Sequence, residues 1–246
     1  MNLLVCVSKT PDTTAKVDFS DDGKSYNESG KQFIMNPYDE WYALVRALEL
    51  KESEGGEVVI INVGPASNDP ILRKGLAIGA DKAVRIDAEA PDALFAASQV
   101  AEYAKDKDFD IIFTGKETID YSGGIFGGML AELLDLPFVS FASKMDYQDG
   151  QATIERDVEG GVEVLKTSGK FVISAAKGLA EQRIPNMRGI MMAKRKPLEV
   201  VEAADAKTGP AVVKFELPPE KGEVKMVDPE NMEELVRLLH EEAKVI

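Results

Sequence analysis

Short apolar runs alternate with amphipathic segments over the first 137 residues of the chain. The apolar runs lie at residues 3–7, 58–63, 83–86 and 111–113. Continuous runs of this length are typical of strands that are covered on both faces of a sheet. Between them, apolar residues recur at helical spacing in segments that open near Asn36, Asp69, Pro91 and Ser122. Strands that alternate with helices predict an α/β fold with a doubly wound, mainly parallel sheet.

The first two predicted helices carry clear start signals. Asn36 can cap the first helix, Pro37 fits its first position, and Asp39 lies at its third position against the helix dipole. Asp69 and Pro70 open the second helix in the same way. The start of the first helix is therefore a defined point that can join a site built at the strand ends.

The pattern changes after residue 137. Further strands are predicted at residues 139–145, 152–158, 162–167 and 170–174, with a hairpin turn at Gly160-Gly161. A short basic helix is predicted at residues 188–196, and residues 197–227 show no packed pattern before a final helix opens at Asp228. We therefore expect residues 1–196 to form one α/β domain, and residues 197–246 to form an extended arm that packs on its outside or on another protein.

The stretch from residue 110 to residue 137 combines a strand, a polar loop and a helix. Gly115 ends the strand, and Ser122 or Gly123 opens the helix. Such a helix start presents free N–H groups to an anion, and Gly123 with Gly124 lets a phosphate approach the backbone. The stretch is neither a P-loop nor a dinucleotide fingerprint, so a Gly-rich turn that merely precedes a buried helix is the alternative.

Ligands of doubly wound sheets bind at the carboxyl ends of the strands. Here those ends fall at residues 6–8, at residues 63–64 and from Gly115 onward. Together with the helix start at Asn36, these separate points are expected to converge on one crevice. Their convergence is stronger evidence for a ligand site than any one motif alone.

Composition excludes several classes of protein. The 246 residues are 44% hydrophobic and carry a net charge of −14, which argues against a nucleic-acid binder. No apolar run is long enough to span a membrane, and no signal peptide precedes the first strand, so no membrane insertion is expected. Cys6 is the only cysteine, which suits a reducing compartment and a cytoplasmic location.

No catalytic or metal-binding constellation is visible. His240 is the only histidine and is expected at the surface of the final helix, so a catalytic triad or a zinc site cannot be assembled. There is also no nucleophile elbow and no paired-carboxylate motif. The chain is therefore expected to be a carrier or a ligand-binding protein and not an enzyme that transforms a substrate.

Eight short segments have a specific order and spacing; they lie at residues 4–12, 35–38, 62–65, 72–81, 115–120, 155–161, 179–183 and 190–194. Through these segments the chain resembles a known family, the β subunits of electron transfer flavoproteins, over nearly its whole length.

The resemblance implies a heterodimer whose α subunit carries most of the FAD site, while the β subunit holds a structural AMP. Such a complex carries electrons from acyl-CoA-type dehydrogenases, for example in fatty acid β-oxidation, to a quinone oxidoreductase or a similar acceptor. By the same resemblance, the AMP contacts fall on strand ends and helix starts. They are Cys6, Asn36, Pro37, Tyr38, Asp39, Val63, Gly115, Lys116, Glu117, Thr118, Ile119, Asp120, Tyr121, Ser122, Gly123, Gly124, Ile125 and Phe126.

Two further roles come from the resemblance. Tyr38 matches an aromatic residue that approaches the flavin ring, and a packing residue at a helix start is the alternative. Leu179 matches the anchor of a recognition loop at residues 175–187 that docks into an apolar pocket on dehydrogenases, and an exposed leucine among polar residues is a plausible hot spot. An ordinary surface leucine is the alternative. The expected partner-binding residues are Leu179, Glu181, Arg183, Lys194 and Lys196.

The chain also departs from the family. Many members carry polar side chains late in the nucleotide loop, where this chain has Gly124, Ile125 and Phe126. Phosphate contacts there are left to backbone N–H groups and Ser122. Some relatives bind a second FAD in place of AMP and split electron pairs between two acceptors, but the loop lacks their usual pattern too. AMP is therefore the preferred ligand; an electron-bifurcating subunit and a nucleotide-binding regulatory module without flavin are the alternatives.

Overall fold

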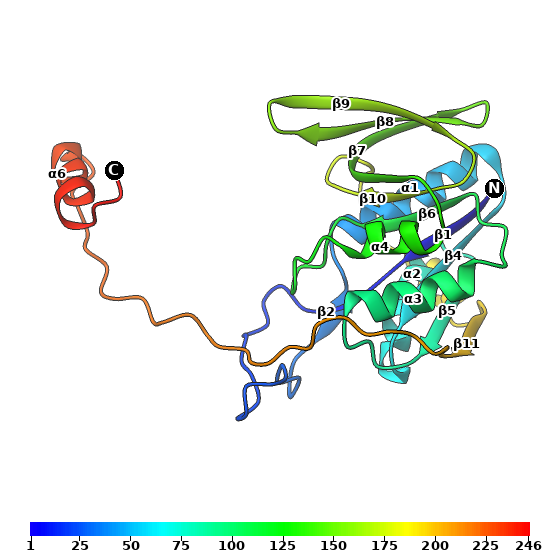
Figure 1. Cartoon of the computed structure of the whole chain (residues 1–246), viewed down its shortest axis with the longest axis horizontal. Helices are drawn as coiled ribbons and strands as arrows, with labels where there is room; N and C mark the ends of the chain where they lie inside the picture. The colour runs from blue at the N-terminus through cyan, green and yellow to red at the C-terminus, as the bar shows by residue number, and fades with distance from the viewer. The chain divides into compact units, whose positions relative to one another are not determined.

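The computed structural model describes all 246 residues, which form two compact units. The larger unit comprises residues 1–17 and 27–213, and the smaller comprises residues 18–26 and 214–246. A nine-stranded sheet runs through the larger unit (Figure 1). From one edge to the other its strands are β11 (Leu198–Glu202), β5 (Lys82–Asp87), β4 (Glu57–Val63), β1 (Asn2–Cys6), β6 (Ile111–Gly115), β10 (Phe171–Ala175), β7 (Phe138–Gln148), β8 (Gln151–Val158) and β9 (Gly161–Ser168).

The sheet is doubly wound about β1. Strands β4 and β6 lie on either side of β1, and both run parallel to it. The chain moves outward from β1 to β4 and β5, and then returns to place β6 on the opposite side of β1. The direction of winding therefore reverses between β1 and β6, and a crevice opens beyond the carboxyl ends of these strands. The fold class predicted from the sequence is confirmed.

Helices cover both faces of the parallel strands. Helices α1 (Asp39–Glu54) and α2 (Asp69–Ile78) share one apolar core with Leu3 and Val5 of β1. Helices α3 (Ala93–Ala104) and α4 (Phe126–Leu133) share the other core with Leu4 and Cys6 of the same strand. Alternate residues of a strand point to opposite faces, so a strand buried on both faces must be apolar throughout. This is why the strands appear in the sequence as continuous apolar runs.

The second half of the sheet becomes antiparallel. Strand β10 runs parallel to both β6 and β7, whereas β7, β8 and β9 pair antiparallel in sequence order. Val158 of β8 lies opposite Gly161 of β9, and the turn residue Gly160 has a φ of +85° that suits glycine. The hairpin predicted at Gly160-Gly161 is confirmed, and so is the short helix after it, α5 (Met187–Ala193).

Three strands escape the sequence pattern. β2 (Lys9–Pro11) and β3 (Phe33–Met35) form a small antiparallel pair, and β11 adds an edge to the main sheet beside β5. The expectation of no packed structure between residues 197 and 227 is therefore wrong at β11. Only Leu198 and Val201 of that strand are partly buried, because an edge strand has a neighbouring strand along only one of its two edges. Its apolar signal is correspondingly weak.

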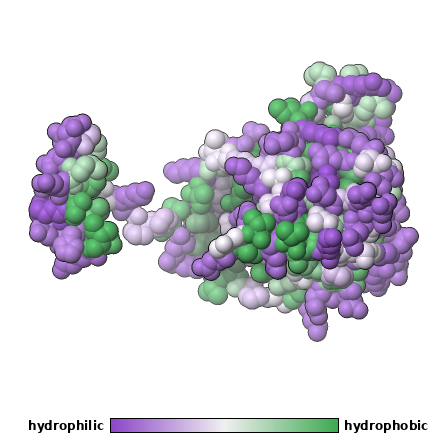
Figure 2. Space-filling model, turned by 90° about the horizontal axis from the view of Figure 1, so that it is seen from above, coloured by the Kyte–Doolittle hydropathy of each residue, from purple (hydrophilic) through white to green (hydrophobic).

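The smaller unit joins distant parts of the chain. Phe19 pairs with Tyr26 across a short hairpin, and its ring stacks on that of Phe215 at a centroid distance of 5.0 Å. The arm ends in helix α6 (Met232–Arg237), capped by the side chain of Asn231, and in the π-helical turn η2 (Leu238–Glu242). Apolar residues gather along one side of this terminal helical segment (Figure 2).

None of the helices in this fold combines the length and the apolarity that crossing a bilayer requires.

Candidate functional site

Three neighbouring strands end side by side at the switch point of the sheet. Cys6 of β1 pairs with Ile61 of β4, and the N–H of Val7 donates to the carbonyl of Ile61 at 2.9 Å. On the other side of β1, β6 ends at Gly115. The predicted convergence of Cys6, Val63 and Gly115 on one edge of the sheet is therefore observed. The side chain of Cys6 is nevertheless buried in the α3–α4 core, and burial raises the pKa of its thiol.

Asn36 ties the start of α1 to the loop after β6. Its side-chain amide donates to the carbonyl of Glu117 at 3.0 Å, and its side-chain oxygen accepts from the N–H of Ile119 at 3.1 Å. Its own N–H donates to the carbonyl of Ser8 at 2.9 Å. Asn36 is fully buried, and through these three bonds it joins the residues after β1 to the loop after β6.

The capping role predicted for Asn36 is wrong. Helix α1 begins at Asp39, and the N-cap position belongs to Tyr38, whose side chain makes no capping bond. The amide of Asn36 is already committed to the loop, so it cannot cap a helix that starts three residues later. Tyr38 holds a φ of +64°, a left-handed conformation that non-glycine residues rarely adopt. This sharp turn swings its ring outward, where 52% of the residue is exposed.

Glu40 is a buried carboxyl in the first turn of α1, and sequence reasoning missed it. Its two oxygens accept from the N–H of Ser8 at 2.6 Å and from the hydroxyl of Ser8 at 2.7 Å. A side-chain carbon on Gly115 would come within 2.7 Å of the Glu40 side chain, so only glycine fits where β6 passes this helix. Burial raises the pKa of Glu40 to about 8, and the nearby Asp120 and Asp39 carboxylates act in the same direction.

The start of α1 is a poor place for an anion. Asp39 and Glu40 both occupy its first turn and already use its positive end. Burial raises the pKa of Asp39, and Glu117 raises it further, while Lys116 opposes them. A phosphate brought here would meet several carboxylates at close range.

Helix α4 offers the opposite environment. It begins at Phe126 rather than at Ser122 or Gly123 as predicted, because Ser122 and Gly124 turn the chain with φ values of +47° and +63°. Its first turn contains no acidic residue, and no side chain caps it, so its first N–H groups face the loop. A side chain on Gly123 would meet nothing within 4 Å, so the approach is open. This donor set fits a phosphate.

The loop between β6 and α4 is exposed over most of its length. Residues 120–125 are exposed, and Lys116, Glu117, Thr118 and Ile119 are partly buried or at the margin of exposure. Beside the loop lies a cavity of about 250 Å³. It is lined by Pro37, Tyr38, Asp39, Tyr42, Lys116, Glu117, Ile119 and Lys177. The structure thus gathers the loop and the helix start that the sequence connects with a nucleotide, and Tyr38 stands at their rim.

Leu179 does not lie where the sequence suggests. The expectation of an exposed leucine is wrong: 5% of Leu179 is exposed, and it packs into the α1–α2 core. Gly178 makes this possible for two reasons. Its φ of +104° is a backbone conformation that favours glycine, and a side chain at this position would come within 2.9 Å of the Ser143 carbonyl oxygen. Leu179 is therefore a core residue in this conformation.

Two of the expected partner-binding cations are bound within the chain itself. The Arg183 guanidinium forms a two-pronged ion pair with Glu52, at 2.5 and 2.9 Å. The Lys196 ammonium donates to three backbone carbonyls of the α2 C-terminal region, those of Leu76, Gly79 and Ala80. Glu181 and Lys194 are exposed, as a partner surface requires.

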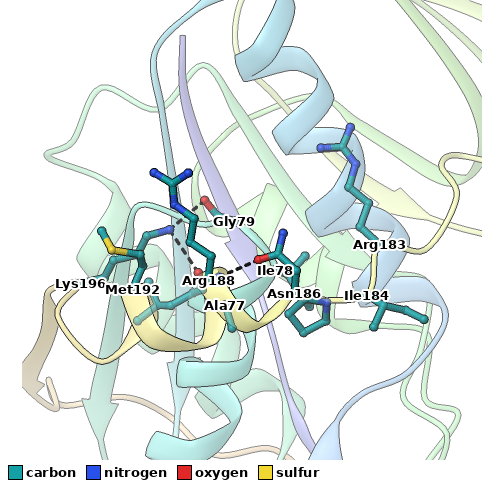
Figure 3. A pocket seen from close by; sticks show the side chains of 12 residues that line it. Ala77, Ile78, Gly79, Arg183, Ile184, Asn186, Arg188, Met192 and Lys196 are labelled. Carbon is teal, nitrogen blue, oxygen red and sulfur yellow. Dashed lines mark hydrogen bonds between the residues drawn. The ribbon is translucent and has the colours of Figure 1, made fainter.

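Other apolar residues of the same segment are exposed instead. Ile184 is 87% exposed and Met187 75%, and Met191 on α5 is also exposed. Figure 3 shows Ile184 projecting from the segment that leads into α5, next to a pocket of about 440 Å³ between α2 and α5. Sequence reasoning favoured the one leucine. Ile184, Met187 and Met191 recur at positions i, i+3 and i+7, which is the spacing of a core-facing helix, so the sequence alone did not identify them as exposed.

Comparison with known proteins places these features in context. The sequence model of the electron transfer flavoprotein domain matches residues 24–206. The chain is 40% identical over 260 residues to a Bacillus subtilis protein named electron transfer flavoprotein subunit beta, with 100% of each chain covered. It is 31% identical over 255 residues to the mouse protein of the same name, covering 100% of this chain and 99% of the other. A relative of this name in Syntrophomonas wolfei is 35% identical over 223 residues, or 90% and 87% of the two chains.

Proposed function

The chain belongs to the electron transfer flavoprotein family, on the β-subunit side, and from that membership we propose how its site works. Members of this family are electron carriers, and an α subunit is the partner that the family implies. In our proposal, the chain binds AMP at the carboxyl ends of β1, β4 and β6 and closes one side of an FAD site on the α subunit. It receives electrons from acyl-CoA-type dehydrogenases for a quinone oxidoreductase or a similar acceptor, in the cytoplasm.

The uncapped start of α4 is the observation that carries the nucleotide proposal. Its free N–H groups and partial positive charge suit a phosphate, and no carboxylate occupies its first turn. Gly123 and Gly124 leave the approach open, and Asn36 holds the other end of the same loop. Because the phosphate contacts come from backbone rather than from side chains, the residues Gly124, Ile125 and Phe126 are compatible with this role.

The flavin side of the proposal rests on Tyr38. Its exposed ring stands at the rim of the crevice and can pack against the edge of a partner's cofactor, while Lys116 and Lys177 line the cavity behind it. FAD, when bound by the α subunit, accepts and releases the electrons. The residues of this chain shape the wall of that site and exclude water from it.

In our proposal, the partner docks on the exposed apolar residues that follow Leu179 in the sequence and not on Leu179 itself. We assign Met187 as the central contact, since it is 75% exposed and lies between the exposed Ile184 and Met191. The exposed Lys194 and the surrounding basic residues fit an acidic rim on the partner. An apolar centre with a charged rim is the arrangement that produces binding hot spots.

The test counts cofactors in the purified protein after co-expression with its α subunit. One FAD and one AMP per heterodimer, with the flavin reduced by a dehydrogenase, is the expected result. Two FAD per heterodimer, reducible by NADH, would show instead a bifurcating flavoprotein. A colourless single chain with tightly bound AMP would show a regulatory nucleotide-binding module and would rule out the carrier.

A further inference from the structure

Helix α5 is too short to be stable by itself. It spans seven residues, from Met187 to Ala193, and only Ala193 is buried. Isolated helices of this length do not persist in water, and burial of one alanine stabilises little. Contacts with the rest of the fold must therefore hold the helix in place.

Lys196 provides the first of these contacts. Its ammonium reaches back to the C-terminal end of α2 and donates to the carbonyls of Leu76 at 3.1 Å, Gly79 at 3.2 Å and Ala80 at 2.6 Å. Figure 3 shows the bond from Lys196 to Gly79. All three N–H donors of the lysine are thus used on carbonyls in the last turn of α2 and in the two residues after it, where helical hydrogen bonding ends. A cation at this position also interacts favourably with the helix dipole.

Arg73 of α2 provides the reverse contact. One nitrogen of its guanidinium donates to the carbonyl of Ala193 at 2.8 Å and to that of Lys196 at 2.7 Å, at the C-terminal end of α5. Each helix therefore has its C-terminal carbonyls capped by a cation from the other segment. The two helices also touch closely, because a side chain on Gly189 would come within 2.5 Å of the Ala77 carbonyl.

The beginning of the segment is fixed separately. The indole N–H of Trp41 donates to the Arg183 carbonyl at 3.2 Å, and the Arg183 side chain is paired with Glu52. Both anchors come from α1. The exposed residues Ile184, Met187 and Met191 are consequently presented from a segment that is attached at both ends.

We propose that Lys196 and Arg73 form a reciprocal clamp, and that they are positioning residues for partner docking although neither presents its charge to the partner. The clamp orders α5 before the partner arrives, so that binding loses little conformational entropy. This inference rests on the proposed function of the segment as a docking surface. It differs from a steering role, in which Lys196 acts only through its charge.

Lys194 supplies the matched control. It lies two residues before Lys196 and carries the same charge, but it is exposed and takes no part in the clamp. Lys196→Met and Lys194→Met therefore remove equal charge and differ only in the loss of the three carbonyl contacts. Lys196→Arg keeps a multiple donor at the clamp, and Arg73→Gln opens it from the other side.

The experiment uses the heterodimer with its flavin, and an acyl-CoA dehydrogenase reduced by its substrate as electron donor. Lys196→Met should raise the KM for the dehydrogenase about tenfold at unchanged kcat, both at low and at high salt. Arg73→Gln should behave alike, and Lys196→Arg should restore most of the affinity. Lys194→Met should have a smaller effect that disappears at high salt, because exposed charges are screened.

Hydrogen exchange of the α5 amides gives a readout that needs no dehydrogenase. Lys196→Met and Arg73→Gln should speed exchange at residues 190–193 at least tenfold, and Lys194→Met should leave it unchanged. Equal effects of Lys196→Met and Lys194→Met on KM, or unaltered exchange in both clamp variants, would overturn the clamp. Faster exchange in both clamp variants, together with a wild-type complex that accepts no electrons from dehydrogenases, would instead leave the clamp standing and refute the docking function.

Discussion

At the scale of single residues, buried polar side chains organise the candidate site. Asn36 is fully buried and bonds to the backbone at Glu117 and Ile119. Glu40, 4% exposed, bonds twice to Ser8. Both connect elements that are far apart in the sequence, and both would be read from the sequence as ordinary polar residues of a helix start. Their roles follow from burial, which makes every unpaired polar atom costly.

Replacing Asn36 tests the link between this brace and the nucleotide. Asn36→Ala removes two bonds to the loop and leaves two partly buried backbone groups unpaired, at a cost of about 1–3 kcal/mol. We expect AMP to bind about tenfold more weakly to the nucleotide-stripped heterodimer, as measured by calorimetry. Asn27→Ala is the control, because Asn27 is exposed and bonds only to Ser29 nearby. Unchanged AMP affinity in Asn36→Ala would show that the loop needs no brace.

The raised pKa of Glu40 gives the protein a specific dependence of stability on pH. In the unfolded chain this carboxyl ionises with a pKa of 4.5, and in the fold its pKa is about 8. The fold therefore favours the neutral acid. Its contribution to stability is complete below pH 4.5, declines as the pH rises, and is lost above about pH 8. At most it amounts to about 5 kcal/mol, since one pKa unit corresponds to about 1.36 kcal/mol.

Glu40→Gln should abolish this dependence while keeping the shape of the side chain. The free energy of unfolding of Glu40→Gln, relative to the wild type, should increase between pH 5 and pH 8 and then level off. Urea unfolding at a series of pH values measures it. Glu132→Gln, at an exposed position of α4, should show no such trend. A constant difference across the series would mean that Glu40 is ionised in the fold throughout.

At the scale of elements, the segment from Leu179 to Lys196 shows how burial separates residues of similar chemistry. Leu179 enters the core, whereas Ile184 and Met187 stay outside. The segment is attached to α1 and α2 mostly through bonds from side chains to backbone carbonyls, which no apolar pattern in the sequence reveals. Its apolar residues at helical spacing, Ile184, Met187 and Met191, are exposed instead of forming a core.

Alanine substitutions at Leu179 and Met187 should separate an effect on stability from an effect on partner docking. Leu179→Ala should lower the free energy of unfolding by about 2–4 kcal/mol, because it leaves a cavity in the core. In the folded protein its KM for the dehydrogenase should be close to that of the wild type. Met187→Ala should leave stability within about 0.5 kcal/mol and raise that KM about tenfold. The reverse assignment, with docking lost in Leu179→Ala alone, would restore the leucine as the anchor.

At the scale of the whole molecule, the chain divides into a large sheet unit and a smaller unit that contains the arm. The terminal helical segment of the arm exposes Met232 and Val236, and residues 245 and 246 beyond it are also apolar and exposed. Exposed apolar residues gathered on one side of a helix indicate a surface that another protein covers. We infer that this surface packs on the α subunit, in keeping with the arm expected from the sequence.

Charges placed on that helix test the inference. Met232→Asp with Val236→Asp should prevent assembly of the heterodimer, because the charges would be buried without partners. Size-exclusion chromatography after co-expression measures assembly, and the unfolding of the sheet unit should be unaltered. Glu233→Lys changes the net charge by the same magnitude in the opposite direction, at an exposed polar position of the helix, and should assemble normally. Normal assembly of the double variant would place the α subunit elsewhere on the chain.

Local sequence patterns were enough to predict the alternation of strands and helices, the doubly wound sheet and the edge at which a ligand can bind. These follow from local periodicity, since burial on both faces requires continuous apolar strands and parallel strands end at one edge. The packing of the folded chain was needed to show that Asn36 braces a loop, that Leu179 is buried, that Lys196 caps α2 and that β11 joins the sheet. Each of these depends on a contact between distant residues, such as the 116 positions that separate Lys196 from Ala80. Local patterns carry no information on such contacts, because burial and long-range hydrogen bonds are set by how the elements pack.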